Sequence, residues 1–152
     1  MMPRRSFLRS ALLGAAGLVV MPNVLAPVRR PFLWIADSDP TVAFTIQTLA
    51  RHYGFAEVHI FACKRTVIKR LLATAPKPTL LVTDYWSAQM RGSEFIRLAR
   101  DASPATKVIL FSAVVGNLQG WIAVAGPNAP QPDAIVEKPS ARKLMALLCR
   151  IQ

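Results

Sequence analysis

Side chains that could take part in phosphoryl chemistry follow the short apolar runs of this 152-residue sequence. Carboxylates supply the hard oxygen ligands that Mg²⁺ prefers, and an ammonium group or a hydroxyl can hold the oxygens of a phosphoryl group. If these side chains converge, they predict a Mg²⁺ and phosphoryl-transfer site. The residues are Asp37 and Asp39 after the first run, Asp84 after the third, Ser112 after the fourth and Lys138 after the fifth.

The apolar runs themselves are the expected strands. They are nearly unbroken rather than alternating with polar residues, which is typical of parallel strands buried on both faces. In an open parallel sheet, functional groups gather beyond the carboxyl ends of the strands, so we expect the side chains above to meet at one edge. The runs cover residues 32–36, 58–62, 79–82, 108–111 and 134–136.

Helical patterns separate these runs, so the sequence predicts an α/β fold of five strand–helix units. The fourth unit is irregular, because the glycines and prolines of residues 116–132 leave room only for a short helix over 118–125 and a loop. Ser140 is the expected cap of the last helix. The apolar stripes of the other helices are Val42, Ile46 and Leu49; Val67, Leu71 and Leu72; Phe95, Leu98 and Ala99; and Leu144, Leu147, Leu148 and Ile151.

Charge and cysteine content exclude several function classes. The net charge is +11, yet the basic residues are spread along the chain, and residues 27–152 carry 16 basic and 8 acidic groups. The densest basic run has no interleaved aromatic residues and is interpreted as one solvated helix face, not as a nucleic-acid site. Two Cys and two His are too few for a disulfide framework or a zinc finger. The basic run contains Lys64, Arg65, Lys69 and Arg70.

The amino terminus has the pattern of an export signal. Residues 1–26 have a basic start and an apolar stretch over 11–21 that is too short to span a bilayer. They end in Val24-Leu25-Ala26, which suits cleavage by a signal peptidase. Residues 4–9, which read RRSFLR, resemble the twin-arginine motif. A non-native extension or an amphipathic surface segment would explain the same residues. We therefore assign residues 1–30 to a signal-like or non-native segment and 31–152 to the folded domain.

Residues 31–152 resemble the receiver domain of two-component response regulators. An acidic cluster, Asp37-Ser38-Asp39, ends the first expected strand, and Asp84 follows the third. The resemblance also covers order and spacing: Met90 and Gly92 lie six and eight positions after Asp84, the pair Ser112-Ala113 ends the fourth strand, and Lys138-Pro139 ends the fifth.

This resemblance implies a flavodoxin-like (βα)5 sandwich around a five-stranded parallel sheet of order 2-1-3-4-5. It implies that Asp84 is the phosphoacceptor and attacks a phosphohistidine of a histidine kinase or phosphotransfer protein. Mg²⁺ would bind Asp37, Asp84 and the backbone carbonyl of Trp86, and Ser112 and Lys138 would contact phosphoryl oxygens. Pro139 would follow a cis peptide bond. The chain would then be a phosphoacceptor switch, not an enzyme, with at most slow self-dephosphorylation.

Several positions depart from the family pattern. Ser38 stands where a second metal-binding acid is usual, although Asp39 lies on the same side of the strand as Asp37 and could substitute. Ala88 replaces a usual proline, and Ile135 stands at a common aromatic switch position. Trp121 could replace that aromatic element, but we expect a core residue there.

Two other functions are compatible with parts of the sequence. The stretch from Asp37 to Thr41 also resembles the first motif of haloacid-dehalogenase-type phosphatases, with Asp37 as nucleophile and Asp39 as general acid/base. That family needs a further acidic motif after its lysine, and no Asp or Glu follows Lys138. The departures at Ser38, Ala88 and Ile135 also permit a receiver-like module that binds a partner without phosphorylation.

The two localisation signals conflict. A phosphorelay draws its phosphoryl group from ATP through a cytoplasmic kinase, whereas a twin-arginine signal would export the chain. We predict a cytoplasmic protein, because the receiver pattern extends over far more residues. No transmembrane span, nucleic-acid partner or output domain is expected, so the chain would signal as a stand-alone receiver through contact with an unknown target protein.

Overall fold

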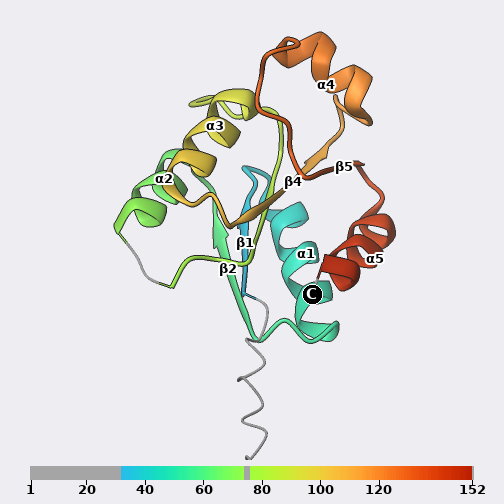
Figure 1. Ribbon diagram of the computed structural model, residues 1–152. Coiled ribbons are helices and arrows are strands. Elements are labelled where there is room, and N and C mark those ends of the chain that lie inside the picture. Colours follow the sequence, from blue (N-terminus) through green and yellow to red (C-terminus); the bar gives the residue numbers. More distant parts are fainter. Residues whose placement is uncertain (1–31, 74–75, 152) are drawn as a thin grey trace, which may run out of the picture.

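The computed structural model describes residues 32–73 and 76–151, and in this part of the chain five parallel strands alternate with five helices (Figure 1). The strand order is β2-β1-β3-β4-β5, which confirms the predicted flavodoxin-like α/β fold. The strands are β1 (Phe32–Ala36), β2 (Glu57–Phe61), β3 (Leu80–Thr83), β4 (Lys107–Ser112) and β5 (Ala134–Glu137). The helices are α1 (Pro40–His52), α2 (Lys64–Ala73), α3 (Gly92–Ala102), α4 (Leu118–Ala125) and α5 (Ala141–Ile151).

Helices cover both faces of the sheet, with α1 and α5 on one side and α2 and α3 on the other (Figure 1). Successive residues of a strand point to opposite faces. Leu33 and Ile35 therefore join the core beneath α1 and α5, whereas Trp34 and Ala36 join the core beneath α2, α3 and α4. All four are at most 1% exposed, which explains why β1 is a continuous apolar run.

The edge strand β2 departs from the predicted pattern. Its sequence, EVHIF, includes Glu57 and His59, only Val58 is buried, and Ile60 is 38% exposed. The reason is its place in the sheet, because β2 pairs with β1 alone. A nearly unbroken apolar run therefore indicated a strand here, but not burial on both faces.

Local capping sets where two of the helices begin. The Asp39 carboxylate accepts hydrogen bonds from the backbone N–H groups of Thr41 (2.8 Å) and Val42 (3.3 Å), so Asp39 is the N-cap of α1. The Asn117 side chain accepts from Gly120 N–H at 2.8 Å and caps α4. The predicted short helix over 118–125 is confirmed, and it ends at Gly126, whose φ of 92° favours glycine.

Trp121 anchors α4 to the sheet, which confirms the prediction that it is a core residue. Its side chain is 0% exposed and meets the Tyr85 ring edge to face, with 6.0 Å between centroids. The Tyr85 hydroxyl donates to the carbonyl of Val124 at 3.1 Å. The residue directly after Asp84 thereby contacts α4 twice.

None of the helices within residues 32–73 and 76–151 is long and apolar enough to cross a membrane. The predicted export signal lies outside the described residues.

Asp133 ties the start of β5 to β4 and α3. Its Oδ2 accepts from Val108 N–H at 2.8 Å and from Arg100 Nη2 at 3.1 Å, and its Oδ1 lies 3.2 Å from Lys107 Nζ. Burial by itself would raise the pKa of Asp133, but the Val108 N–H and the two cations outweigh burial and hold that pKa below its usual value. The ionised form is therefore the one that the fold stabilises.

We predict that Asp133→Asn lowers the free energy of unfolding at neutral pH by about 1.5–3 kcal/mol, the usual contribution of hydrogen bonds to a charged group. Because the folded pKa is depressed, this contribution is present above the unfolded pKa of about 3.9. It is lost as pH falls through the folded pKa.

Urea unfolding at neutral pH and at a series of pH values below about 4 measures the difference between the two proteins. Asp101→Asn is the matched control, since Asp101 is 69% exposed and its only ion pair in the described residues is with Arg97 at 4.0 Å. If the difference in unfolding free energy between Asp133→Asn and wild type stayed constant as the pH was lowered, that result would contradict this account.

Candidate functional site

The strand-end residues predicted from the sequence lie at one edge of the sheet. Asp37 directly follows β1, Asp84 follows β3, Ser112 is the last residue of β4, and Lys138 follows β5. Two backbone hydrogen bonds connect these segments: Asp84 N–H donates to Ala36 at 3.3 Å, and Lys138 N–H donates to Ser112 at 3.0 Å. The parallel sheet thus brings together groups that are 101 positions apart in the chain.

Asp37 is a buried carboxylate held by two partners. It is 4% exposed, its Oδ1 accepts from Asp39 N–H at 2.9 Å, and its Oδ2 accepts from Lys138 Nζ at 2.7 Å. The Lys138–Pro139 peptide bond is cis, as predicted. The Lys138 ammonium also lies 5.6 Å from the centre of the Phe111 ring.

Asp84 pairs with Lys64, which was not among the predicted site residues. The Nζ of Lys64, the first residue of α2, lies 2.9 Å from Asp84 Oδ1. It donates to the backbone carbonyl of Tyr85 at 3.1 Å and lies 5.8 Å from the centre of the Phe95 ring. Lys64 is only 2% exposed, so an ammonium group is buried directly beside the predicted phosphoacceptor.

The interpretation of Lys64 as part of a solvated basic face was therefore wrong, although Arg65, Lys69 and Arg70 are exposed as expected. Lys64 precedes Val67 by three residues and Leu71 by seven, and all three are buried. This spacing puts them on one face of the helix. Extending the Val67–Leu71 stripe back by one turn would have revealed that Lys64 faces inward.

Burial dominates the electrostatics of the Lys64–Asp84 pair. It lowers the pKa of Lys64 and raises the pKa of Asp84, while the attraction between the two groups opposes both shifts. Asp37 and Lys138 act on the pKa of Asp84 with opposite signs, so two carboxylates and two ammonium groups form one electrostatic cluster. Removing one member leaves its partner buried without a counter-charge, which is strongly destabilising.

Ser112 and Asp39 are both engaged in local backbone contacts. The Ser112 Oγ, at a residue 3% exposed, accepts from Val114 N–H at 3.1 Å and Val115 N–H at 3.3 Å. Its hydroxyl hydrogen can still be donated to another group. The Oδ1 atom of Asp39 accepts from the backbone N–H groups at the start of α1, so this oxygen is held at the helix terminus.

Met90, Gly92 and Trp86, which follow Asp84 in the chain, lie in different environments. Met90 is buried in the core under α3. A Cβ on Gly92 would lie 2.9 Å from the Tyr85 ring, so only glycine lets α3 begin this close to the site. Trp86, the proposed source of a metal-binding carbonyl, has a side chain that is 54% exposed.

Mg²⁺ does not fit this arrangement of side chains. Asp37 and Asp84 each pair with a lysine, Asp39 caps a helix, and position 38 is a serine. No group of three or more His, Cys, Asp or Glu residues within 32–73 and 76–151 could hold a metal ion. A cation site would require the carboxylates to give up their ammonium partners.

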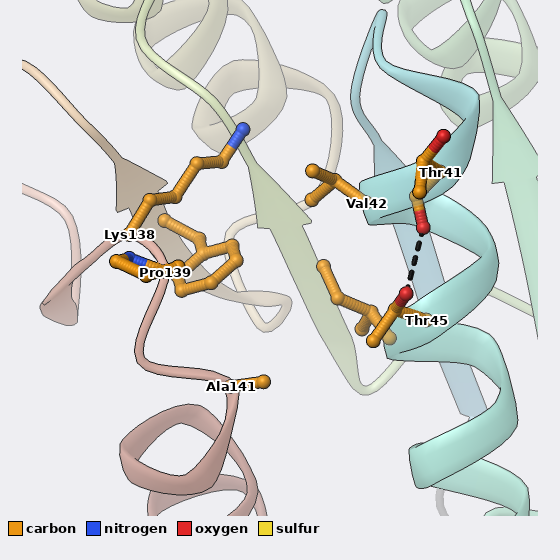
Figure 2. Close-up of a pocket in the computed structure, with 8 residues that line it drawn as sticks. Thr41, Val42, Thr45, Lys138, Pro139 and Ala141 are labelled. Carbon is orange, nitrogen blue, oxygen red and sulfur yellow. Dashed lines mark hydrogen bonds between the residues drawn. The ribbon is translucent and has the colours of Figure 1, made fainter.

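An apolar pocket of about 190 Å³ lies beside Lys138, between α1 and the segment that joins β5 to α5 (Figure 2). Thr41, Val42 and Thr45 form the α1 side, and Lys138, Pro139 and Ala141 face them. The Thr45 hydroxyl is satisfied within the helix, since it donates to the Thr41 carbonyl at 2.8 Å. The pocket therefore offers apolar surface next to the charged cluster.

Comparisons with known proteins rest on structure alone. No family model and no curated protein matches the sequence. Three solved structures superpose on about four-fifths of the chain. The signal receiver domain of an HD domain-containing protein from Pseudomonas fluorescens Pf-5 has a TM-score of 0.68 at 18% identity, and the match covers 81% of this chain and 94% of that one.

The other two structures give similar values. A response regulator receiver protein from Sinorhizobium medicae WSM419 has a TM-score of 0.65 at 20% identity, covering 81% of this chain and 94% of its own. A CheY-like receiver domain protein from Methanospirillum hungatei JF-1 has a TM-score of 0.64 at 21% identity, covering 79% and 91%. With its strand order and helix arrangement, this chain has the fold of response regulator receiver domains.

Proposed function

We propose that residues 31–152 form a receiver module of a two-component phosphorelay, with Asp84 as the phosphoacceptor. The observation that carries this proposal is the position of Asp84 at the carboxyl end of β3, in one electrostatic cluster with Asp37, Lys64 and Lys138. A carboxylate that pairs with one ammonium group and has a second in the same cluster, at the edge of a parallel sheet, suits the transfer of an anionic group.

The proposed chemistry is a displacement at phosphorus. A carboxylate oxygen of Asp84 forms the new P–O bond, the P–N bond of a donor phosphohistidine breaks, and its electron pair remains on the imidazole. Lys138 and the hydroxyl of Ser112 contact phosphoryl oxygens and offset their charge. Mg²⁺ would supply further positive charge if it bound, but Asp37 and Asp84 are each paired with a lysine and do not fit a metal.

The partners follow from this chemistry. The donor is a histidine kinase or a phosphotransfer protein, and the phosphorylated module passes its state to a target protein by contact. Because such a donor draws on ATP, we place the module in the cytoplasm.

A receiver-like module that binds its partner without phosphorylation is the second candidate. Ser38 favours it, because a serine at this position takes one carboxylate away from the site. The phosphatase alternative has less support, since Asp39, its general acid/base, is engaged in capping α1.

We predict that the wild-type protein takes up one phosphoryl group from acetyl phosphate in a buffer that contains Mg²⁺, and that Asp84→Asn abolishes this uptake. Asparagine keeps the size of the side chain but is not a carboxylate nucleophile. Intact-protein mass spectrometry measures the uptake, and near-UV circular dichroism confirms that each variant is folded.

Asp101→Asn, a change at an exposed aspartate on α3, is the matched control and should leave uptake unchanged. Uptake that persists in Asp84→Asn and disappears only in Asp37→Asn would point to the phosphatase chemistry. A wild-type protein that takes up nothing would leave the phosphorylation-independent module as the better function.

A further inference from the structure

Lys64 is a buried charge that the fold alone does not require. Burying an ammonium group is costly unless it is paired and hydrogen-bonded. The stripe that Lys64 shares with Val67 and Leu71 would be filled more readily by an apolar side chain. The ammonium of Lys64 instead contacts Asp84 Oδ1 and the Tyr85 carbonyl, 2.9 and 3.1 Å away.

The charges of the cluster balance without a metal. Asp37 and Asp84 together carry two negative charges, and Lys64 and Lys138 carry two positive charges. The two ammonium groups therefore bring the same formal charge as one divalent cation. The third acid, Asp39, is engaged at the start of α1.

We propose that Lys64, together with Lys138, supplies the positive charge that a divalent cation would otherwise supply, so that Asp84 accepts a phosphoryl group without metal. This inference rests on the proposed function. The ion pair uses Oδ1 of Asp84, which leaves Oδ2 to form the bond to phosphorus. With acetyl phosphate as donor, the bond between phosphorus and the bridging oxygen breaks and acetate leaves with the electron pair.

Lys64 stays beside the reacting carboxylate throughout this step. Its contact with the Tyr85 carbonyl and its position over the Phe95 ring hold the ammonium in place before transfer. A preorganised charge of this kind stabilises the negative charge that develops on the phosphoryl group, and it needs no rearrangement when the reaction occurs.

The first test uses the wild-type chain with acetyl phosphate, either in EDTA or in Mg²⁺. We expect the rate of phosphoryl uptake to differ by no more than about twofold between the two buffers, because the fixed ammonium groups already supply the charge. Uptake that occurs in the Mg²⁺ buffer but not in the EDTA buffer would overturn this inference and leave the proposed function standing. Uptake in neither buffer would overturn both.

The second test removes the ammonium group of Lys64 and keeps most of the length of its aliphatic side chain. We expect Lys64→Met to lose at least about tenfold of the uptake rate in EDTA, since one charge-stabilising donor is gone. Lys64→Arg, which keeps a positive charge, should retain more of that rate than Lys64→Met. Lys69→Met is the matched control, because Lys69 lies exposed on the same helix. A folded Lys64→Met with an unchanged rate in EDTA would show that Lys64 is structural only.

Calorimetric titration with Mg²⁺ provides a readout that is independent of phosphoryl transfer. We expect Lys64→Met to bind Mg²⁺ more tightly than the wild-type chain, because the substitution frees Asp84 from its counter-charge. Tighter Mg²⁺ binding by the wild-type chain would contradict the view that Lys64 takes the place of the cation.

Discussion

All strands of the described sheet run in the same direction, and this constraint governs where chemistry can occur in the molecule. Parallel strands end at a common edge, so the residues that follow β1, β3, β4 and β5 meet although they are far apart in the chain. The layers on both faces are apolar. Polar groups such as Asp37 and Asp84 can therefore be held together only at that edge, where each finds a counter-charge.

Two ion pairs determine the electrostatics of this edge of the sheet. Lys138 pairs with Asp37 at 2.7 Å, and Lys64 pairs with Asp84 at 2.9 Å. Neither pair is a surface contact, since the side-chain exposed fractions are 18% and 3% in the first pair and 2% and 12% in the second. Buried pairs of this kind contribute little net stability, so their value lies in the electrostatic environment that they create around Asp84.

Tyr85 connects the surroundings of Asp84 to α3 and α4. Its backbone carbonyl accepts a hydrogen bond from Lys64, and its hydroxyl donates to Val124 in α4. Its ring meets Trp121, and its close approach to Gly92 sets where α3 begins. A single residue next to Asp84 thus contacts the cationic partner of the site and two helices.

Residue order was enough to predict the succession of the elements and the side chains that reach the edge of the sheet. Continuous apolar runs identify buried strands, Gly116–Pro132 limits α4, and the residue after each strand must lie at the shared edge, because these signals are local. They predicted the short helix over 118–125, the burial of Trp121 and the convergence of Asp37, Asp84, Ser112 and Lys138.

The pairing of these groups depends on tertiary contacts. A basic run is compatible with an exposed face or with one inward-facing lysine, and the outcome depends on what lies opposite the first turn of α2. Asp84, 20 positions further along the chain, lies there. Likewise Asp39 could have faced a metal, but the unsatisfied N–H groups at the start of α1 use its carboxylate. Ion pairing depends on contact distances between segments that are far apart in the chain, and residue order alone contains no information on those distances.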